Sequence, residues 1–233
     1  MFALSNSLAP RKSPILCYVT DRLSLPHAAP SALMQKIDAI LSAGVDWVQI
    51  REKDLCAREL VALTREALVR AALHSQGKSQ ASRILVNDRI DIALAERAGG
   101  VHLGENALPV NEAARLIENH ASRKDFLVGV SCHSLEAAKS AAGGGAGYLF
   151  FGPVFATPSK AAFGPPQGVE RLAEVCRTIA IPVLAIGGIT LENAAACFAA
   201  GAAGLAAIRL FQDSSDPAAT VRAFRQRSGA AVP

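Results

Sequence analysis

Residues 47–53 read Trp-Val-Gln-Ile-Arg-Glu-Lys, a short apolar run that turns polar at its end. Seven further runs rich in Val, Ile, Leu and Phe recur along the chain, each followed by a segment that reads as helix or as loop and then helix. Short continuous apolar runs of this kind are typical of parallel strands that are buried on both faces. The eight runs are Ile15–Thr20, Trp47–Arg51, Ile84–Asn87, Val101–Leu103, Phe126–Val130, Tyr148–Gly152, Val183–Ile186 and Leu205–Ile208.

Eight strand and helix units predict an α/β fold, a single TIM (β/α)8 barrel formed by residues 15–228. The alternative is an open doubly wound sheet, which usually has fewer strands and a Gly-x-Gly-x-x-Gly turn after the first. Here the turn after the first strand contains Thr20-Asp21-Arg22, so the barrel is favoured. We expect residues 1–14 to form a frayed leader and residues 229–233 a short tail.

The composition excludes several classes of protein. With 233 residues, 51% hydrophobic and 19% charged, the chain can bury one sizeable core. The net charge is +4 and no basic run is longer than Arg11-Lys12, which disfavours nucleic-acid binding. The five cysteines include no Cys-x-x-Cys pair, which disfavours a disulfide framework or structural zinc. We expect a cytoplasmic protein without a membrane segment, and homo-oligomerisation stays open.

Polar residues follow the apolar runs at the end where such a barrel builds its active site. Alternation along the second run places Gln49, Arg51 and Lys53 on one side of the strand. Arg51, Lys53 and Lys160, together with the amide of Asn87, form a set suited to a phosphate or diphosphate. Each cation alone would most often be a solvated surface charge, so the prediction depends on their shared place at strand ends.

Two turns extend this prediction. Backbone N–H groups at Gly187-Gly188 could hold a second phosphate, although the pair could also form a tight turn and nothing more. Asp88 is a candidate magnesium ligand beside a diphosphate, because Mg²⁺ prefers oxygen ligands. The alternative role for Asp88 is to cap the helix expected over residues 89–96.

Two histidines lie near predicted strand ends and differ in their expected roles. His133 comes just after the fifth strand, where a neutral imidazole could shuttle protons. His102 lies between Val101 and Leu103 and is expected to be a core histidine. The long Pro and Gly-rich segment Pro153–Gly168 is a candidate lid.

Several collinear motifs together resemble thiamine phosphate synthase, over about residues 15–210. They are Tyr18-Val19-Thr20-Asp21, Gln49-Ile50-Arg51-Glu52-Lys53, Val86-Asn87-Asp88-Arg89, Gly100-Val101-His102-Leu103-Gly104, Gly129-Val130-Ser131, Gly152-Pro153-Val154-Phe155, Thr157-Pro158-Ser159-Lys160 and Ala185-Ile186-Gly187-Gly188-Ile189. The resemblance implies a TIM barrel transferase that joins hydroxymethylpyrimidine diphosphate to thiazole phosphate, releases pyrophosphate and uses Mg²⁺.

The resemblance also implies roles for individual residues, with Asp88 as the metal ligand. The residues expected to act in catalysis are Arg51, Lys53, Ser131, Lys160 and His133. Those expected to contact the two phosphorylated substrates are Gln49, Ile50, Arg51, Glu52, Lys53, Asn87, Ser131, Thr157, Pro158, Ser159, Lys160, Gly187, Gly188, Ile208 and Arg209. Fixed positive charge and a metal would stabilise the leaving pyrophosphate, so no covalent nucleophile is needed.

Two departures from the family pattern leave alternatives open. Ala107 stands where the synthases usually have a second metal-binding Asp, and Arg209 stands where a serine usually contacts the thiazole phosphate. The stretch Ser131–Glu136 resembles thiazole tautomerase, a proton-transfer isomerase of the same fold in which the residue matching His133 is catalytic. A third hypothesis is a non-catalytic barrel that binds a thiamine precursor and regulates a partner.

Overall fold

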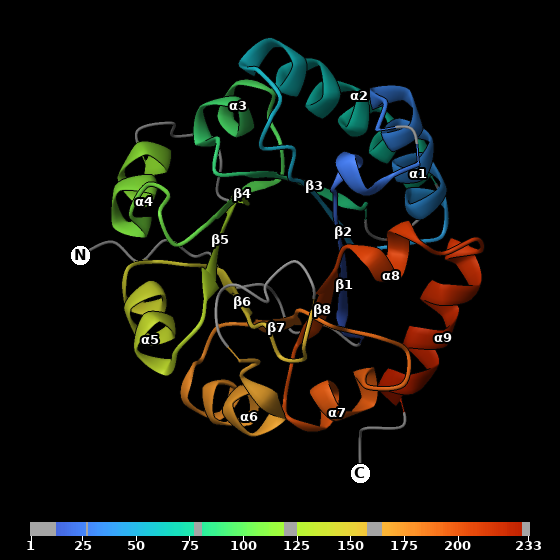
Figure 1. The fold of residues 1–233 in the computed structure, drawn as a ribbon. Helices are drawn as coiled ribbons and strands as arrows, with labels where there is room; N and C mark the ends of the chain where they lie inside the picture. The colour runs from blue at the N-terminus through green and yellow to red at the C-terminus, as the bar shows by residue number, and fades with distance from the viewer. Residues whose placement is uncertain (1–12, 27, 77–80, 119–124, 158–164, 230–233) are drawn as a thin grey trace.

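The computed structural model describes residues 13–26, 28–76, 81–118, 125–157 and 165–229 as one closed barrel of eight parallel strands. The strands pair in sequence order, and β1 closes the ring by pairing with β8. Figure 1 looks along the barrel axis and shows the helices as an outer ring around the strands. The predicted TIM barrel is therefore confirmed, and the open sheet is excluded.

The strands lie within one or two residues of the predicted apolar runs. Their bounds are β1 Ile15–Val19, β2 Trp47–Ile50, β3 Arg83–Asn87, β4 Gly100–Leu103, β5 Leu127–Cys132, β6 Tyr148–Phe151, β7 Val183–Ile186 and β8 Gly204–Ala207. The helices are η1 Arg22–Ser24, α1 Pro30–Ser42, α2 Ala57–Ser75, α3 Ile90–Ala95, α4 Val110–Glu118, α5 Leu135–Gly143, α6 Gly168–Thr178, α7 Ala194–Ala199, α8 Arg209–Gln212 and α9 Pro217–Gly229. The last helix thus ends one residue beyond the domain boundary expected from the sequence.

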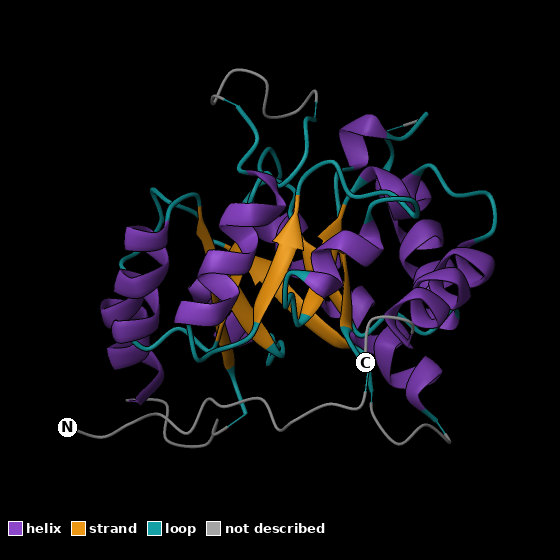
Figure 2. Ribbon diagram, turned by 90° about the horizontal axis from the view of Figure 1, so that it is seen from below, coloured by secondary structure: helices purple, strands orange, loops and turns teal. Residues whose placement is uncertain are grey.

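Alternate strand residues divide between two separate cores, because successive side chains of a strand point to opposite faces. One set packs outward against the ring of helices, and Val48 and Ile50 of β2 belong to it. The other set fills the barrel interior, and Figure 2 shows the strands enclosed by helices on both sides. The interior set is Ile15, Cys17, Val19, Trp47, Leu85, Leu127, Tyr148, Phe150, Leu184 and Ala206.

Glycine at position 129 gives the ring of Tyr148 room inside the barrel. The two residues are register partners on β5 and β6. A Cβ atom on Gly129 would lie 2.0 Å from Cζ of Tyr148 and 2.3 Å from its hydroxyl oxygen. Because real Cβ atoms do not approach neighbours so closely, the tyrosine can lie across the interior only beside a residue without a side chain.

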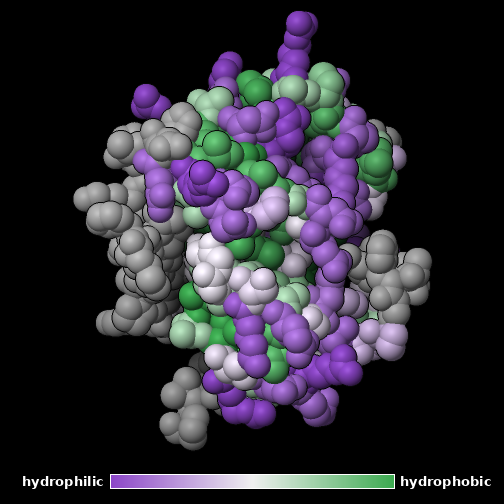
Figure 3. Space-filling model, turned by 90° about the vertical axis from the view of Figure 1, so that its left-hand side faces the viewer, coloured by the Kyte–Doolittle hydropathy of each residue, from purple (hydrophilic) through white to green (hydrophobic). Residues whose placement is uncertain are grey.

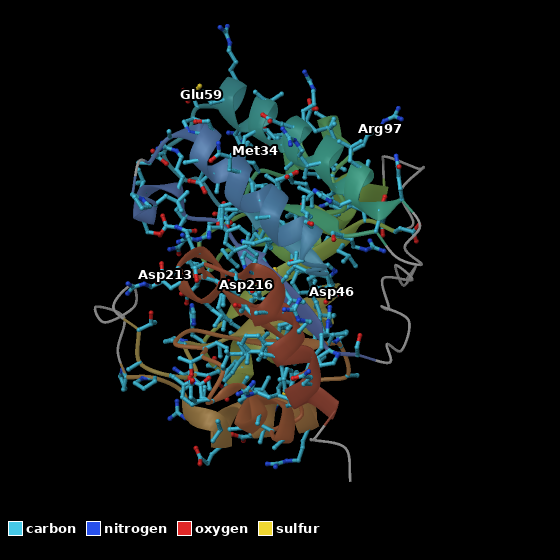
Figure 4. The ribbon with its side chains drawn as sticks, turned by 90° about the vertical axis from the view of Figure 1, so that its right-hand side faces the viewer. Met34, Asp46, Glu59, Arg97, Asp213 and Asp216 are labelled. Carbon is cyan, nitrogen blue, oxygen red and sulfur yellow. The ribbon has the colours of Figure 1, made fainter. Side chains whose placement is uncertain are left out.

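Hydrogen bonds around Asp46 and Arg225, here called the polar clamp, join three elements at the end of the barrel opposite the mouth. Asp46, just before β2, accepts hydrogen bonds from the Leu16 backbone N–H at 2.8 Å and from Arg225 of α9 at 2.6 Å. Arg225 also donates to the carbonyl oxygen of Pro14. In Figure 4, Asp46 lies at the opposite end of the barrel from Asp213. The clamp therefore joins β1, β2 and the last helix far from the strand ends that carry the predicted site.

The outer surface mixes polar and apolar groups. Figure 3 shows one face on which hydrophilic residues are interspersed with smaller hydrophobic areas. Among the described residues, no helix combines the length and the apolarity needed to cross a membrane.

Substitution Asp46→Ala is expected to lower the free energy of unfolding by about 2 kcal/mol, because it leaves a buried strand N–H without its acceptor and removes the carboxylate partner of a half-buried guanidinium. Urea unfolding followed by circular dichroism measures this. Arg115→Ala, which removes an exposed ion pair with Glu112, serves as the control and is expected to change stability by less than about 0.5 kcal/mol. Equal losses in the free energy of unfolding for the two substitutions would contradict a stabilising role of the clamp.

Candidate active site

A chain of hydrogen bonds runs across the mouth from β2 to the loop after β4. The Gln49 amide donates to Oδ1 of Asn87 at 2.7 Å, and the Asn87 amide donates to Oδ2 of Asp88 at 2.7 Å. The other oxygen of Asp88 accepts the Gly104 backbone N–H at 2.7 Å. The chain brings three predicted site residues together, and Asp88 does not cap α3, whose N-cap residue is Arg89.

The carboxylate of Asp88 fixes the orientation of both amides. An ionised carboxylate only accepts hydrogen bonds, so Asn87 must turn its NH₂ group to Asp88 and its oxygen to Gln49. Gln49 must then donate with its own NH₂ group, which leaves its Oε1 as a free acceptor. This Oε1 atom is buried and has no hydrogen-bond partner among the described residues. A buried acceptor without a partner is costly, so a ligand N–H group suits this position.

The cations from β2 differ in their exposure. Arg51 follows Ile50 and is half-buried, while Lys53 is exposed. Within the described part of the chain, no hydrogen bond or ion pair of the Arg51 guanidinium is found. Its positive charge acts on the nearby barrel interior, where it contributes to lowering the pKa of His102. Arg51 therefore places an available positive charge beside the hydrogen-bonded amides.

His102 lies inside the barrel and links two hydroxyl groups. One ring nitrogen, Nε2, is 2.9 Å from Oγ of Ser131, and the other, Nδ1, is 3.0 Å from the Tyr148 hydroxyl. Burial, and secondarily the charge of Arg51, lowers the pKa of His102 from 6.5 to about 3. The expectation of a buried core histidine is confirmed, and the ring is neutral at physiological pH.

His133 is half-buried at the end of β5 and is anchored by one nitrogen. Its Nδ1 lies within hydrogen-bonding distance of the Gly152 carbonyl oxygen, which can only accept, so Nδ1 carries a proton. In the neutral ring Nε2 is then an acceptor. Cys132 beside it is buried, and burial raises the pKa of its thiol to about 12, with a smaller effect of Glu105. The thiol is therefore a poor nucleophile.

Ile50 and Glu52 face away from the interior. Ile50 packs in the core between the sheet and the helices. The buried Glu52 carboxylate accepts the Thr20 hydroxyl at 2.5 Å and the Arg22 backbone N–H at 3.1 Å. Burial raises its pKa above the ordinary value despite these bonds. In this structure the Glu52 side chain joins the loop after β1 to the loop after β2.

The loop after β6 is only partly described. Its two ends are held together, because the N–H groups of Gln167 and Gly168 donate to the carbonyl oxygens of Pro153 and Val154 at 2.7 and 3.0 Å. Thr157 is described, and it is half-buried. Three predicted contact residues, Pro158, Ser159 and Lys160, lie outside the described residues, as does the middle of the candidate lid.

The turn after β7 packs against this loop, and the turn after β8 follows next around the barrel. Gly187 and Gly188 have φ angles of 92° and 64°, and a Cβ on Gly188 would lie 2.6 Å from the Ala156 carbonyl oxygen. Both positions therefore require glycine. Ile208 borders the interior cluster, whereas Arg209 pairs with Asp213 at 3.2 Å and its side chain is 68% exposed. In this conformation the Arg209 guanidinium is directed to Asp213.

The residues fit a magnesium ion only jointly with a substrate. No group of three or more His, Cys, Asp and Glu side chains is placed to hold a metal within the ranges that the structure describes. Asp88 offers one carboxylate whose two oxygens each accept one hydrogen bond and keep a further lone pair. Mg²⁺ commonly binds one or two carboxylates together with substrate phosphates and water. Asp88 fits that arrangement if a diphosphate supplies further oxygens.

Two site features were not foreseen from the sequence. Tyr148 was expected only as a strand residue, and its hydroxyl bond to His102 joins residues 46 positions apart. The unpartnered oxygen of Gln49 was also unforeseen, because it depends on the orientation of two neighbouring amides. The sequence signal that could have indicated an interior Tyr148 is its pairing, as a large residue, with Gly129 on the adjacent strand.

Protein stability is expected to fall as pH drops from 6.5 toward 3, partly because of His102. The folded pKa lies below the unfolded one, so the unfolded chain takes up the proton first and stability is lost on acidification. The contribution of one such group reaches about 1.4 kcal/mol per pH unit. Urea unfolding at several pH values should show a shallower dependence for His102→Gln than for the unchanged protein. Identical slopes would contradict a neutral buried His102.

Comparison with known proteins agrees with this architecture. A sequence model of the family described as "Thiamine monophosphate synthase" matches residues 16–211. The thiamine-phosphate synthase of Roseiflexus sp. is 40% identical over 92% of this chain and 85% of its own. That of Methanospirillum hungatei is 40% identical over 90% of this chain and 95% of its own. The structure of a thiamine phosphate pyrophosphorylase from Pyrococcus furiosus superposes with a TM-score of 0.79 at 27% identity, covering 94% of this chain and 97% of that one. The chain therefore belongs to the thiamine monophosphate synthase family.

Proposed function

We propose that the protein is a thiamine-phosphate synthase, a transferase that joins hydroxymethylpyrimidine diphosphate to thiazole phosphate. The observation that carries this proposal is the group at the mouth that combines an available cation with the Gln49–Asn87–Asp88 chain. An anionic group and a ring bearing N–H donors would both find partners there. The names of the relatives support the same reaction.

The proposed reaction breaks one C–O bond and forms one C–N bond. The bond between the pyrimidine methylene carbon and the diphosphate oxygen breaks, and its electron pair leaves with pyrophosphate. The thiazole nitrogen then donates an electron pair to the methylene carbon and forms the new C–N bond. Negative charge grows on the leaving group and positive charge on the pyrimidine, so catalysis requires fixed groups that stabilise the leaving charge.

The pyrimidine diphosphate would lie over the ends of β2, β3 and β5. The free Oε1 of Gln49 would accept a hydrogen bond from the amino group of the pyrimidine. Arg51, Lys53 and the Ser131 hydroxyl would bind the diphosphate, together with Asn87 and Lys160. The thiazole phosphate would lie over β6 to β8, with Thr157 to Ser159, Gly187, Gly188, Ile208 and Arg209 as candidate contacts.

Asp88 would hold a magnesium ion against the diphosphate. When bound there, magnesium would neutralise charge on the leaving group. Asp88 also has a second role, because it orients the Asn87 amide, which in turn orients the Gln49 amide. We also propose that the protein acts in the cytoplasm, where thiols such as those of its five free cysteines stay reduced.

Arg51→Ala is expected to lower kcat/KM for thiamine phosphate formation by about 100-fold, because it removes charge-assisted hydrogen bonds to the diphosphate. Lys160→Ala is expected to act likewise, whereas His133→Ala should cost little. Arg58→Ala, which removes an exposed arginine from the first turn of α2, is the matched control and should leave the rate unchanged. The assay uses both purified substrates with Mg²⁺ and follows thiamine phosphate.

The same variants test the alternatives. The thiazole tautomerase hypothesis predicts the reverse pattern, with His133→Ala abolishing isomerisation of the thiazole carboxylate phosphate. A folded protein that binds thiazole phosphate yet turns over neither substrate set would support a regulator. Absence of thiamine phosphate in the presence of both substrates and Mg²⁺ would refute the synthase.

Asp88→Asn is expected to raise the Mg²⁺ concentration for half-maximal activity by at least about tenfold, because an amide oxygen is a weaker ligand than a carboxylate. Chelation of Mg²⁺ should abolish activity of the unchanged protein, and added Mg²⁺ should restore it. Asp91→Asn makes the same chemical change at the exposed pair with Arg89 and should leave the Mg²⁺ requirement unaltered. A common Mg²⁺ dependence of all three proteins would argue against Asp88 as the ligand.

A further inference from the structure

Three polar side chains, those of Tyr148, His102 and Ser131, form a line inside the barrel. The ring of His102 lies 4.1 Å from the ring of Phe150, centroid to centroid, and 5.5 Å from that of Tyr148. Tyr148 is in turn 4.7 Å from Trp47. His102 and Tyr148 are fully enclosed, while Ser131 at the other end of the line is half-buried. The line therefore leads from the interior to the mouth.

The Tyr148 hydroxyl is hydrogen-bonded to His102. Among the described residues, the Tyr148 hydroxyl has no other hydrogen-bond partner. Burial raises its pKa well above the ordinary value, so the phenol keeps its proton. The described residues of the interior set around it are apolar, apart from the thiol of Cys17, which is only a weak acceptor.

Counting protons decides which nitrogen of His102 carries the hydrogen. If Nδ1 carried it, Nδ1 would donate to Tyr148, and the phenolic proton would be left buried without an acceptor. An unsatisfied buried donor is strongly disfavoured, whereas an unused lone pair on a hydroxyl oxygen is tolerated. Tyr148 therefore donates to Nδ1, and the proton of the neutral ring is on Nε2.

The position of the proton on His102 also determines whether the Ser131 hydroxyl accepts from His102 or donates to it. Nε2–H donates to Oγ of Ser131 across 2.9 Å, so Ser131 cannot donate its own proton back to His102. Its O–H is then free to donate to another acceptor. With the opposite tautomer, Nε2 would accept the serine proton and hold it toward the interior. The tautomer of His102 thus determines the direction in which the Ser131 hydroxyl donates.

We propose that Tyr148 and His102 are positioning residues that hold the Ser131 hydroxyl as a hydrogen-bond donor directed to the diphosphate of the substrate. This inference rests on the proposed function for the identity of that acceptor. The bond strengthens as negative charge grows on the leaving pyrophosphate, so its contribution is larger in the transition state than in the ground state. Gly129 takes part indirectly, because its missing side chain admits the Tyr148 ring.

The first test is the tautomer itself, measured on the ligand-free protein by ¹⁵N NMR with labelled histidine. The two ring nitrogens of a neutral imidazole have well-separated shifts, and His102→Gln assigns the signal. We expect a proton on Nε2 of His102, and Tyr148→Phe should reduce the population of that tautomer. A proton on Nδ1 in the unchanged protein would overturn the inference. This readout does not depend on turnover, so it is separate from any failure of the proposed function.

The second test is a double-mutant cycle in the synthase assay. Tyr148→Phe is expected to lower kcat about fivefold to tenfold with little change in KM, because it releases the serine proton from its fixed direction. In a Ser131→Ala background the same change should alter kcat less than twofold. An equal loss in both backgrounds would show that Tyr148 only supports packing and would overturn the proposal.

Two further variants separate positioning from stability. Tyr18→Phe is the matched control, because it removes another buried tyrosine hydroxyl, bonded to Gln212 at 2.9 Å on the far side of β1. It should reduce stability comparably without the loss in kcat. His102→Gln retains an amide N–H near the place of Nε2–H and should keep more activity than the shorter His102→Asn. A kcat for His102→Gln no higher than that for His102→Asn would contradict a donor role.

Discussion

A closed parallel barrel forces every second residue of each strand into a space that water does not fill. In this protein most of those positions are apolar, but Gln49, Asn87, His102 and Ser131 are not. Buried polar groups need hydrogen-bond partners, and here Gln49 donates to Asn87 on the neighbouring strand while His102 is bonded to Ser131 on the strand next to its own. The orientation of the polar side chains at the mouth follows from this requirement, because side chains that are hydrogen-bonded to one another in the barrel are held in fixed positions.

Two hydrogen-bonded lines result from this constraint, and both end at the mouth. One begins at the Gly104 backbone and reaches Gln49 through Asp88 and Asn87. The other begins at Tyr148 and reaches Ser131 through His102. The first line presents an acceptor and the second a donor, and the charge of Arg51 lies at the end of β2, two residues after Gln49 in the sequence. Such orientation before substrate binds is what electrostatic stabilisation of a leaving group requires.

The sequence was sufficient to predict the fold, but not the contacts within the candidate site. Apolar runs such as Val183–Ile186 coincide with observed strands because burial on both faces requires continuous apolar residues. Gln49 and Arg51 could be placed on one side of their strand by alternation, and Asn87 could be placed at the same mouth by its position at a strand end. The outward direction of Glu52 and the bond between Tyr148 and His102 could not, because they depend on partners distant in the sequence.

The most direct test of this account is a crystal structure with Mg²⁺ and a non-reactive analogue of the pyrimidine diphosphate. We expect Oε1 of Gln49 to accept a hydrogen bond from the pyrimidine amino group, and we expect Asp88 to hold the Mg²⁺. We also expect Arg51 and the Ser131 hydroxyl to contact diphosphate oxygens. A ligand bound away from Gln49, or Mg²⁺ bound without Asp88, would contradict this account.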